Sequence, residues 1–446
     1  MFNKILIANR GEIAVRVIHA CRELGIGTVA IYSDVDRESL HVQIADEAIC
    51  VGPKEVQNSY LNINSILAAC ELSGATAVHP GCGFLAENEK FARMVELCGL
   101  KFVGPSKKAI KFLGDKIKAK QLVKEIGVSV VEGSDGAVFD VEEAKKIAKN
   151  IGYPIIVKAK AGGGGKGIRI VRKESELESS FLLAKSEATL YFGDGEIYIE
   201  KYIENPRHVE VQILGDELGN IIYLGERDCS LQRRNQKLIE EALSPVVDEK
   251  LRVKLGNAAV KIAKASSYYN AGTVEFLLDK DNNFYFMEVN TRVQVEHGIT
   301  ELVSGVDIVK SQIKIAAGKK LKLKQKDIVF KGHSIECRVN AEDPEKGFLP
   351  SPGTIESLNI PCGNGIRVDH AIYSGYRILP YYDNMIAKVM VFDNSRKEAI
   401  SKMASALAEF IVSGVQTNID WHLKILRNKD YLKSNVDIGF LNRLGY

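Results

Sequence analysis

Two segments past the middle of the chain alternate apolar and polar positions and predict a β-hairpin. Thr273–Leu278 and Phe284–Asn290 are rich in β-branched and aromatic residues, and the turn-forming sequence DKDNN separates them. With the turn centred on Asp281–Asn282 and a loop of either two or four residues, Glu275 stands directly opposite Glu288. Directly opposed residues share one face of a sheet, so the hairpin brings two carboxylates together.

The same face carries an amide oxygen, because the strand period of two places Asn290 beside Glu288. Like charges that face each other destabilise a sheet. We therefore expect Glu275, Glu288 and Asn290 to hold a hard divalent cation, Mg²⁺ or Mn²⁺. The alternative is a half-exposed strand whose solvent face happens to be polar.

The polar face continues beyond the hairpin if the chain stays extended. A cation, an amide and a possible general base then follow at alternate positions: Arg292, Gln294 and Glu296. Ionisable side chains are seldom placed against a core without a function, so this run favours a binding wall over a wet strand.

The chain begins with a βαβ pattern. A short apolar strand at Lys4–Ala8, an amphipathic helix at Glu12–Leu24 and a strand at Thr28–Tyr32 predict a parallel sheet covered by helices. The turn after the first strand lacks the G-x-G-x-x-G sequence of dinucleotide sites, which argues against NAD binding there. From residue 331 the pattern changes to antiparallel strands with Gly/Pro turns, followed by an amphipathic helix at Arg396–Ile411.

A glycine-rich loop, AKAGGGGKG, lies between a buried strand at Tyr153–Lys158 and another strand at Ile168–Val171. Because a strand follows it and the P-loop consensus fails, we interpret it as a flexible flap. Such a flap can present backbone N–H groups to phosphate oxygens, with Lys158 and Lys166 adding charge. The alternative is a disordered linker.

Three further segments carry charge. A basic helix is predicted at Lys107–Gly127, with Lys116 in its GDK sequence. After a strand at Ile221–Gly225, we interpret the sequence ERDCSLQRRNQKLIEE as a loop. That loop would carry the basic residues Arg233, Arg234 and Lys237. In a later strand Arg338 shares a face with Glu336, so an ion pair between them is the simplest expectation.

Composition limits the possible functions. A length of 446 residues suits about three domains, and 46% hydrophobic with 26% charged residues is typical of a soluble globular protein. The net charge of +3 gives no general attraction to nucleic acid or anionic lipid. We find neither a signal peptide nor an apolar run of roughly 18 residues, so we expect no membrane span and a cytoplasmic location. Eight cysteines without a CxxC pair indicate reduced, mostly buried thiols.

Several long motifs, in order along the chain, resemble those of biotin carboxylase, a family of the ATP-grasp type. They are IANRGEIA near the start, HPGCGFLAEN at His79–Asn88, GDK at Gly114–Lys116, GGGGKG at Gly162–Gly167, EKYIENPRHVEVQ at Glu200–Gln212, ERDCSLQRR at Glu226–Arg234, MEVNTRVQVEH at Met287–His297 and ECRVNAEDP at Glu336–Pro344. The resemblance covers nearly the whole chain, and its specificity comes from the ordered set.

This resemblance implies an ATP-grasp fold of mixed α/β and α+β class. It implies an N-terminal Rossmann-like domain at 1–113, an ATP-grasp domain at 114–330 with a mobile glycine-rich lid at about 131–203, and a mainly antiparallel C-terminal domain at 331–446. The implied reaction uses ATP to phosphorylate bicarbonate, and biotin on a biotin carboxyl carrier protein captures the CO₂. Two Mg²⁺ or Mn²⁺ ions, carboxyltransferase subunits and a homodimer are also implied.

The resemblance implies roles for individual residues. Those implied to hold the nucleotide are Lys116, Lys158, Gly164, Gly165, the main chain of Glu200, Lys201, Tyr202 and Ile203, His208 and Asn235. Those implied to hold bicarbonate are Lys237, Arg292, Gln294 and the Val295 backbone. Glu296 looks like the base that takes the bicarbonate proton, and Arg338 like the cation that stabilises the biotin enolate. Arg292 orients the small anion and can share the task of Arg338.

Three positions depart from the family pattern: Cys82 where Tyr is usual, Asn235 where His is usual and Gly298 where Pro is usual. The first predicts weaker contact with biotin, and the second removes an imidazole from the nucleotide site. None removes a proposed metal ligand, the base or a key arginine, so we expect activity with altered affinities. The alternatives are another ATP-grasp ligase, such as a carbamoyl-phosphate synthase half, and a catalytically silent nucleotide-binding regulator.

Overall fold

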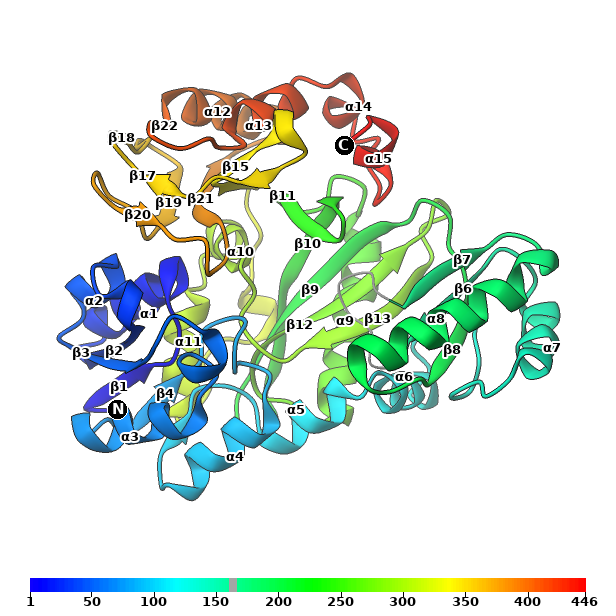
Figure 1. Ribbon diagram of the computed structural model, residues 1–446, viewed down its shortest axis with the longest axis horizontal. Helices are drawn as coiled ribbons and strands as arrows, with labels where there is room; N and C mark the ends of the chain where they lie inside the picture. Colours follow the sequence, from blue (N-terminus) through cyan, green and yellow to red (C-terminus); the bar gives the residue numbers. More distant parts are fainter. Residues whose placement is uncertain (160–166) are drawn as a thin grey trace.

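The N-terminal segment forms a parallel sheet, as its βαβ pattern predicts. The computed structural model describes residues 1–159 and 167–446 and places five strands in the order β3-β2-β1-β4-β5. Ile5, Leu6 and Ile7 of the central strand β1 are fully buried. The strands are β1 Lys4–Ile7, β2 Gly27–Ser33, β3 Glu47–Gly52, β4 Ala77–His79 and β5 Lys101–Phe102. The helices of this region are α1 Gly11–Glu23, α2 Leu40–Ile44, α3 Ile63–Ser73 and α4 Glu89–Leu97 (Figure 1).

An eight-stranded antiparallel sheet runs through the centre of the molecule in the order β13-β12-β9-β10-β11-β14-β21-β19 (Figure 1). Its last three strands follow residue 331, so the C-terminal region extends the central sheet. The strands are β9 Arg207–Gly215, β10 Ile221–Arg233, β11 Gln236–Ala242, β12 Asn270–Leu278, β13 Phe284–Asn290, β14 His333–Asn340, β19 Ile366–His370 and β21 Met385–Asp393. The helices that pack against it include α5 Lys107–Gly114, α6 Lys116–Glu125, α9 Glu249–Ala265, α10 His297–Ser304 and α11 Ile308–Ala316.

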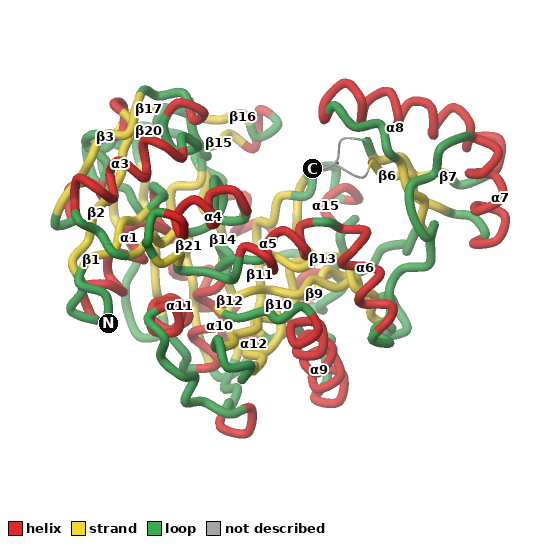
Figure 2. Tube along the Cα trace, turned by 90° about the horizontal axis from the view of Figure 1, so that it is seen from below, coloured by secondary structure: helices red, strands yellow, loops and turns green. Residues whose placement is uncertain are grey.

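A three-stranded antiparallel sheet with two helices forms a separate lobe, which we call the lid lobe (Figure 2). It comprises α7 Val141–Ile151, β6 Ile155–Ala159, β7 Ile168–Val171, α8 Leu177–Phe192 and β8 Ile197–Lys201. Its own core includes Ile155, Phe181 and Ile199, all at most 1% exposed. The glycine-rich loop connects β6 to β7, and the predicted phosphate-binding residues Gly164 and Gly165 lie outside the described residues.

Helices cover the C-terminal end of the central sheet, with α12 Arg396–Glu409 against β14 and β21. The predicted helix was too long: Ile411 begins β22 and is 56% exposed rather than buried. Trp421, which is 2% exposed, packs edge to face on Phe348 at 5.6 Å. The remaining elements are α13 Ile419–Leu426, α14 Lys429–Leu432, α15 Phe440–Arg443 and three short strand pairs, β15 Glu342–Asp343 with β16 Leu349–Pro350, β17 Gly353–Thr354 with β20 Arg377–Ile378, and β18 Leu358–Asn359 with β22 Ile411–Val412.

The prediction of a loop at ERDCSLQRRNQKLIEE is wrong. Strand β10 continues to Arg233, and β11 begins at Gln236, so Lys237 lies on a strand. Only Arg234 and Asn235 form the turn, both with positive φ (50° and 65°). Arg227 and Asp228 of β10 are buried against Glu210 and Arg207 on β9, and these long-range partners are not visible in the local sequence.

The predicted basic helix at Lys107–Gly127 is two helices, α5 and α6. They meet at Asp115, whose side chain accepts a hydrogen bond from the Lys118 N–H and caps α6. This cap places Lys116 at the start of α6.

The hairpin register confirms that Glu275 is opposite Glu288, but by a different route from the one predicted. Leu278 pairs with Phe284 across a loop of five residues, 279–283, and a bulge at Met287, between the pairs Phe276–Phe286 and Glu275–Glu288, restores the predicted pairing. An odd loop length shifts the register by one position, and the extra residue in the bulge reverses that shift.

Within the described ranges, no helix is long and apolar enough to cross a membrane. Four cysteines are buried, Cys82 is half-buried, and the other three are exposed: Cys50, Cys98 and Cys362.

Candidate functional site

A cavity of about 1690 Å³ is bordered by the N-terminal region, the central sheet and the lid lobe. It collects most of the residues predicted from the sequence: Lys116, Lys158, Glu200, His208, Asn235, Lys237, Glu275, Glu288, Asn290, Arg292, Gln294, Val295 and Arg338. These residues come from the lid lobe, from α6, from five strands of the central sheet, from the β10–β11 turn and from the segment that follows β13. The polar face of the hairpin is therefore a cavity wall.

Lys237 on β11 is surrounded by carboxylates. Its Nζ lies 2.6 Å from Glu210, 2.7 Å from Glu296 and 3.3 Å from Glu275. Burial opposes the charge, but the acidic groups around it raise the pKa of Lys237 well above its usual value. Lys237 is therefore an ammonium ion at neutral pH.

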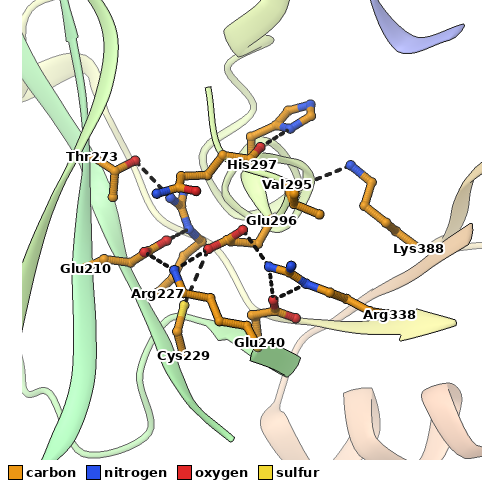
Figure 3. Close-up of polar contacts among 12 residues, drawn as sticks. Glu210, Arg227, Cys229, Glu240, Thr273, Val295, Glu296, His297, Arg338 and Lys388 are labelled. Carbon is orange, nitrogen blue, oxygen red and sulfur yellow. Dashed lines mark hydrogen bonds and ion pairs between the residues drawn. The ribbon is translucent and has the colours of Figure 1, made fainter. Parts of the chain in front are cut away.

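Glu296 precedes α10 and is held between two cations (Figure 3). Its Oε1 accepts from Lys237 Nζ at 2.7 Å, and its Oε2 accepts from Arg338 at 2.9 Å. Burial opposes ionisation, but Lys237, Arg338 and Arg227 hold the pKa of Glu296 well below its usual value. Glu296 is therefore an ionised carboxylate, the form that accepts a proton.

The predicted ion pair between Arg338 and Glu336 is wrong. Arg338 Nε donates to Glu240 Oε1 at 2.6 Å, and the same guanidinium bonds Glu296. Strand β11 pairs with β14 so that Glu240 is opposite Glu336, and Arg338 reaches Glu240 diagonally. Glu336 is fully buried without a hydrogen bond from any described residue, and burial raises its pKa well above the usual value.

Arg292 and Gln294 follow β13 at alternate positions and lie on the same side as Asn290, as their parity predicts. The strand itself ends at Asn290. Arg292 donates to Gln294 Oε1 at 2.9 Å and to Asn290 Oδ1 at 3.2 Å. Its Nε donates to Glu87 Oε2 at 2.8 Å, and Glu87 also accepts from the Thr291 N–H. Glu87 thus orients the guanidinium at the edge of the cavity.

The three proposed metal ligands, Glu275, Glu288 and Asn290, form what we call the metal face. Both of its carboxylates already contact positively charged side chains. Asn290 donates to Glu275 Oε1 at 2.8 Å, and His208 Nε2 lies 3.0 Å from Glu275 Oε2. Burial opposes its charge, but Lys237 and His208 lower the pKa of Glu275. Glu288, opposite Glu275, lies 3.1 Å from Lys116 Nζ. Two carboxylates and an amide oxygen fit a hard divalent ion, which would compete with these nitrogen cations.

Charged groups from the lid lobe line the other end of the cavity. Lys158 Nζ on β6 donates to Glu200 Oε2 at 2.7 Å, and Lys120 on α6 bonds the other oxygen of Glu200. Burial opposes the charge of Glu200, but the two lysines lower its pKa. Lys120 was not predicted from the sequence. It is one of several lysines in a basic helix, and nothing in the local sequence distinguishes it from the others.

The main-chain donors predicted to bind adenine are partly used within the protein. The Lys201 N–H donates to the Glu132 carbonyl oxygen at 2.7 Å, and the Tyr202 N–H donates to the Pro154 carbonyl oxygen at 3.1 Å. The Lys201 side chain donates to backbone carbonyls of the lid lobe rather than into the cavity. Lys201, Tyr202 and Ile203 do not line the cavity among the described residues, so their role in adenine binding stays a prediction.

His208 on β9 is a buried partner of the metal face. Burial favours the neutral ring, but the charge of Glu275 raises the pKa of His208. Its Nδ1 lies 3.2 Å from the Gln232 side-chain amide. Asn235 lines the cavity from the β10–β11 turn, where a left-handed conformation suits asparagine.

Two fully buried residues complete the site, and sequence reasoning gave neither a role. Glu210 on β9 is directly opposite Glu275 and bonds Lys237. Arg227 on β10 donates to Glu210 at 2.6 Å and to Gln212 at 2.8 Å. The parity of β9, which puts Glu210 and Gln212 on one face, was the available signal. This parity indicates a place in the site only once β9 is known to pair with β12, which carries Glu275.

Known proteins resemble the chain over nearly its whole length. The chain matches the family models for the biotin carboxylase N-terminal domain at residues 1–110, the carbamoyl-phosphate synthase L chain ATP-binding domain at 115–324 and the biotin carboxylase C-terminal domain at 336–443. It is 54% identical to biotin carboxylase 1 of Bacillus subtilis, over 99% of this chain and 98% of that protein.

Two solved structures are similar over nearly their whole length. One is the biotin carboxylase domain dimer of Hydrogenobacter thermophilus 2-oxoglutarate carboxylase with MgADP, ADP and bicarbonate (TM-score 0.95, 53% identity, 99% and 98% of the two chains). The other is a Campylobacter jejuni biotin carboxylase–beta-gamma-ATP complex (TM-score 0.96, 49% identity, 99% of both chains). Together with the identity to the Bacillus protein, these similarities show that the chain belongs to the biotin carboxylase family.

Proposed function

We propose that the protein is an ATP-dependent ligase that carboxylates biotin carried on a carrier protein, with bicarbonate as the carbon source. The observation that carries this proposal is the position of Glu296, an ionised carboxylate held between Lys237 and Arg338, which both line the cavity. One side chain can take a proton there while two cations beside it bind anions. An ATP site alone does not require this arrangement.

The nucleotide end of the cavity is suited to a triphosphate. Lys116 and Lys158 supply positive charge at the edge of the metal face and in the lid lobe. Glu275, Glu288 and Asn290 would hold Mg²⁺ or Mn²⁺, which neutralises phosphate charge when it is bound. Following the family resemblance, we assign the adenine end to residues 200–203, the cover over the phosphates to Gly164 and Gly165, and a further place in the nucleotide site to His208.

The other end is suited to bicarbonate. Arg292 and Gln294, joined by a hydrogen bond of 2.9 Å, and the backbone of Val295 would orient the anion beside Lys237. Glu296 takes its proton, and the oxygen then attacks the γ-phosphorus of ATP while ADP leaves. The resulting carboxyphosphate breaks down to CO₂ and phosphate. Biotin N1 gives its proton to the released phosphate and forms the new C–N bond with CO₂, while Arg338 stabilises the negative charge on the ureido oxygen.

A carboxylate with so low a pKa is a weak base. Its pKa is low because Lys237 and Arg338 both contact it. Bicarbonate and the nucleotide would draw these cations toward their own charges, which would raise the proton affinity of Glu296 when both substrates are bound.

The partners in this proposal are a biotin carboxyl carrier protein, carboxyltransferase subunits and a second copy of this chain. The Hydrogenobacter relative is a dimer, which supports the last of these. Its carboxylase is named for 2-oxoglutarate, so the final acceptor differs among close relatives and is a property of other subunits. A cytoplasmic location is part of the same proposal.

The test is an ATP hydrolysis assay with the purified protein. We expect phosphate release to depend on bicarbonate, to rise with free biotin and to be indifferent to ammonia. Stimulation by ammonia but not by biotin would favour a carbamoyl-phosphate-type ligase. Nucleotide binding without any turnover would favour a silent regulator.

A further inference from the structure

Lys388 on β21 is a fully buried lysine whose ammonium group is directed at the catalytic segment (Figure 3). Its Nζ donates to the carbonyl oxygen of Val295 at 2.7 Å. Val295 immediately precedes Glu296, and residues 291–296 belong to no helix or strand. The hydrogen bond from Lys388 therefore restrains a peptide that regular structure does not.

Two carboxylates keep this lysine charged. Nζ lies 3.1 Å from Glu12 on α1 and 3.7 Å from Asp369 on β19. Burial opposes the charge, but Glu12 and Asp369 raise the pKa of Lys388. The N-terminal helix, the C-terminal strands and the segment after β13 thus meet at one ammonium group.

A buried ammonium ion is costly unless its donors are used. An apolar side chain of similar length would fill the same space without that cost, but it could not bond the Val295 carbonyl. The carbonyl contact is also charge-assisted, and such hydrogen bonds are the shorter and stronger kind. The chemistry of the position therefore indicates a role beyond packing.

We propose that Lys388 is a positioning residue for Glu296. By fixing the peptide between Val295 and Glu296, it holds the Glu296 carboxylate between Lys237 and Arg338 and holds the Val295 backbone in place for bicarbonate. Glu12 and Asp369 neutralise Lys388 and so couple the N-terminal and C-terminal regions to the base. This inference rests on the proposed function of Glu296.

The test compares two variants, Glu12→Gln and the double variant Glu12→Gln with Lys388→Met. Glu12 is replaced as well because removing Lys388 alone would leave the Glu12 charge buried without a partner. Asp369 needs no replacement, because it still pairs with Arg367 at 2.7 Å in the double variant. Relative to Glu12→Gln, the double variant is expected to lose about 10- to 100-fold in kcat/KM for bicarbonate, because small displacements of catalytic groups have effects of this size. The KM for ATP should change by less than about twofold.

Lys402→Met is the matched control. Lys402 also donates to a backbone carbonyl, that of Phe392 at 2.9 Å, and pairs with Asp393 at 2.9 Å, but it does not line the cavity. It should leave kcat/KM for bicarbonate unchanged. The inference would be overturned if Lys402→Met lost as much kcat/KM for bicarbonate as the double variant. It would also be overturned if the double variant were as active as Glu12→Gln.

Hydrogen exchange of the segment 291–298 provides a readout that does not need turnover. The double variant should exchange faster there than both Glu12→Gln and the control. If the wild-type protein shows no bicarbonate-dependent turnover, the proposed function fails, while faster exchange would still establish the restraint by Lys388. Unchanged exchange in this segment would refute the restraint whatever the activity.

Discussion

Lys237 Nζ and Glu296 Oε1 lie 2.7 Å apart, so the proposed base is in direct contact with a charged lysine. Contact with a cation makes a carboxylate easier to ionise and harder to protonate. The same cation is placed to receive a substrate anion. Base strength and anion binding are therefore linked through one ammonium group.

Replacing Glu296 with glutamine is expected to lower bicarbonate-dependent ATP hydrolysis by about 10²- to 10⁴-fold, the usual contribution of a positioned proton acceptor. Folding should survive, because Lys237 keeps Glu210 and Glu275 as partners and Arg338 keeps Glu240. Steady-state kinetics and a thermal melt measure the two effects. Wild-type turnover in this variant would remove Glu296 from the role of base.

Reversing the charge at the metal face, Glu288→Lys, is expected to abolish divalent-ion binding and ATP turnover. The Glu288 side chain is 32% exposed and contacts only the exposed Lys116 among the described ion pairs, so the fold should persist. Titration calorimetry with Mg²⁺ and nucleotide, beside circular dichroism, would check both points. In the wild-type protein, a chelator should stop turnover and added Mg²⁺ should restore it. A Glu288→Lys protein that still hydrolyses ATP would contradict the assignment.

Removing the Arg338 side chain with Arg338→Ala is expected to spare ATP binding and to stop carboxybiotin formation. Burial already raises the pKa of Glu240 to about 7 although Arg338 opposes it, so without the arginine Glu240 should become a neutral acid rather than a buried charge. Transfer of labelled bicarbonate to biotin measures the reaction, and nucleotide binding is measured separately. Unaltered carboxylation would refute the role of Arg338.

The hairpin and the polar wall could be predicted from the sequence because they depend on short-range pairing. Glu275 and Glu288 are joined by one loop, and parity alone places Asn290 with them. The bulge could not be predicted, since loop length does not show whether an extra residue enters the turn or the strand.

Contacts between residues far apart in the chain could not be predicted from the sequence. The Arg338 contact with Glu240 spans 98 residues and depends on β11 pairing with β14. The part of β10 from Glu226 onward was mistaken for a loop because Arg227 looks solvent-exposed until Glu210 and Gln212 are placed beside it. Polar residues in a buried strand are recognised only through their partners, and those lie on other strands.

Stability should fall in mild acid because of His422. This fully buried ring contacts the carbonyl oxygen of Arg338 at 2.7 Å, and burial lowers its pKa to about 4 although the carbonyl contact opposes that shift. The unfolded chain binds a proton near the usual value of 6.5, so the stabilisation is complete above that pH and is lost as pH falls toward 4. The expected loss is about 3 kcal/mol at most.

Urea unfolding at pH 7 and pH 5 would measure this effect in the wild type and in His422→Gln. The variant should show a smaller difference between the two pH values. His41 is also buried, with a pKa of about 4, so part of the pH dependence should remain. His19→Gln, at an exposed position where burial lowers the histidine pKa less than at His422, should reduce the pH dependence less. An unchanged pH dependence in His422→Gln would exclude His422 as a source.

Met390 accounts for the glycine at position 298, where the family resemblance leads us to expect proline. A Cβ at Gly298 would lie 2.2 Å from Met390 Sδ and 3.2 Å from its Cε, and Met390 is fully buried. Gly298→Ala should therefore destabilise the protein by about 1–3 kcal/mol through overpacking, although alanine favours a helix over glycine by about 1 kcal/mol. Gly114→Ala, in a helix with open space around the position, is the matched control and should be neutral or stabilising.

Met390→Ala should remove the conflict, so the double variant with Gly298→Ala should be more stable than the sum of the two single effects predicts. Denaturant unfolding of the four proteins in this double-mutant cycle gives the coupling free energy, expected at about 1–3 kcal/mol for residues in contact. Additive effects would show that Gly298 and Met390 are independent. Coupling would mean that the glycine and the large side chain facing it form one packing unit. A proline at position 298, with a Cβ and a ring, would then require a smaller residue at position 390.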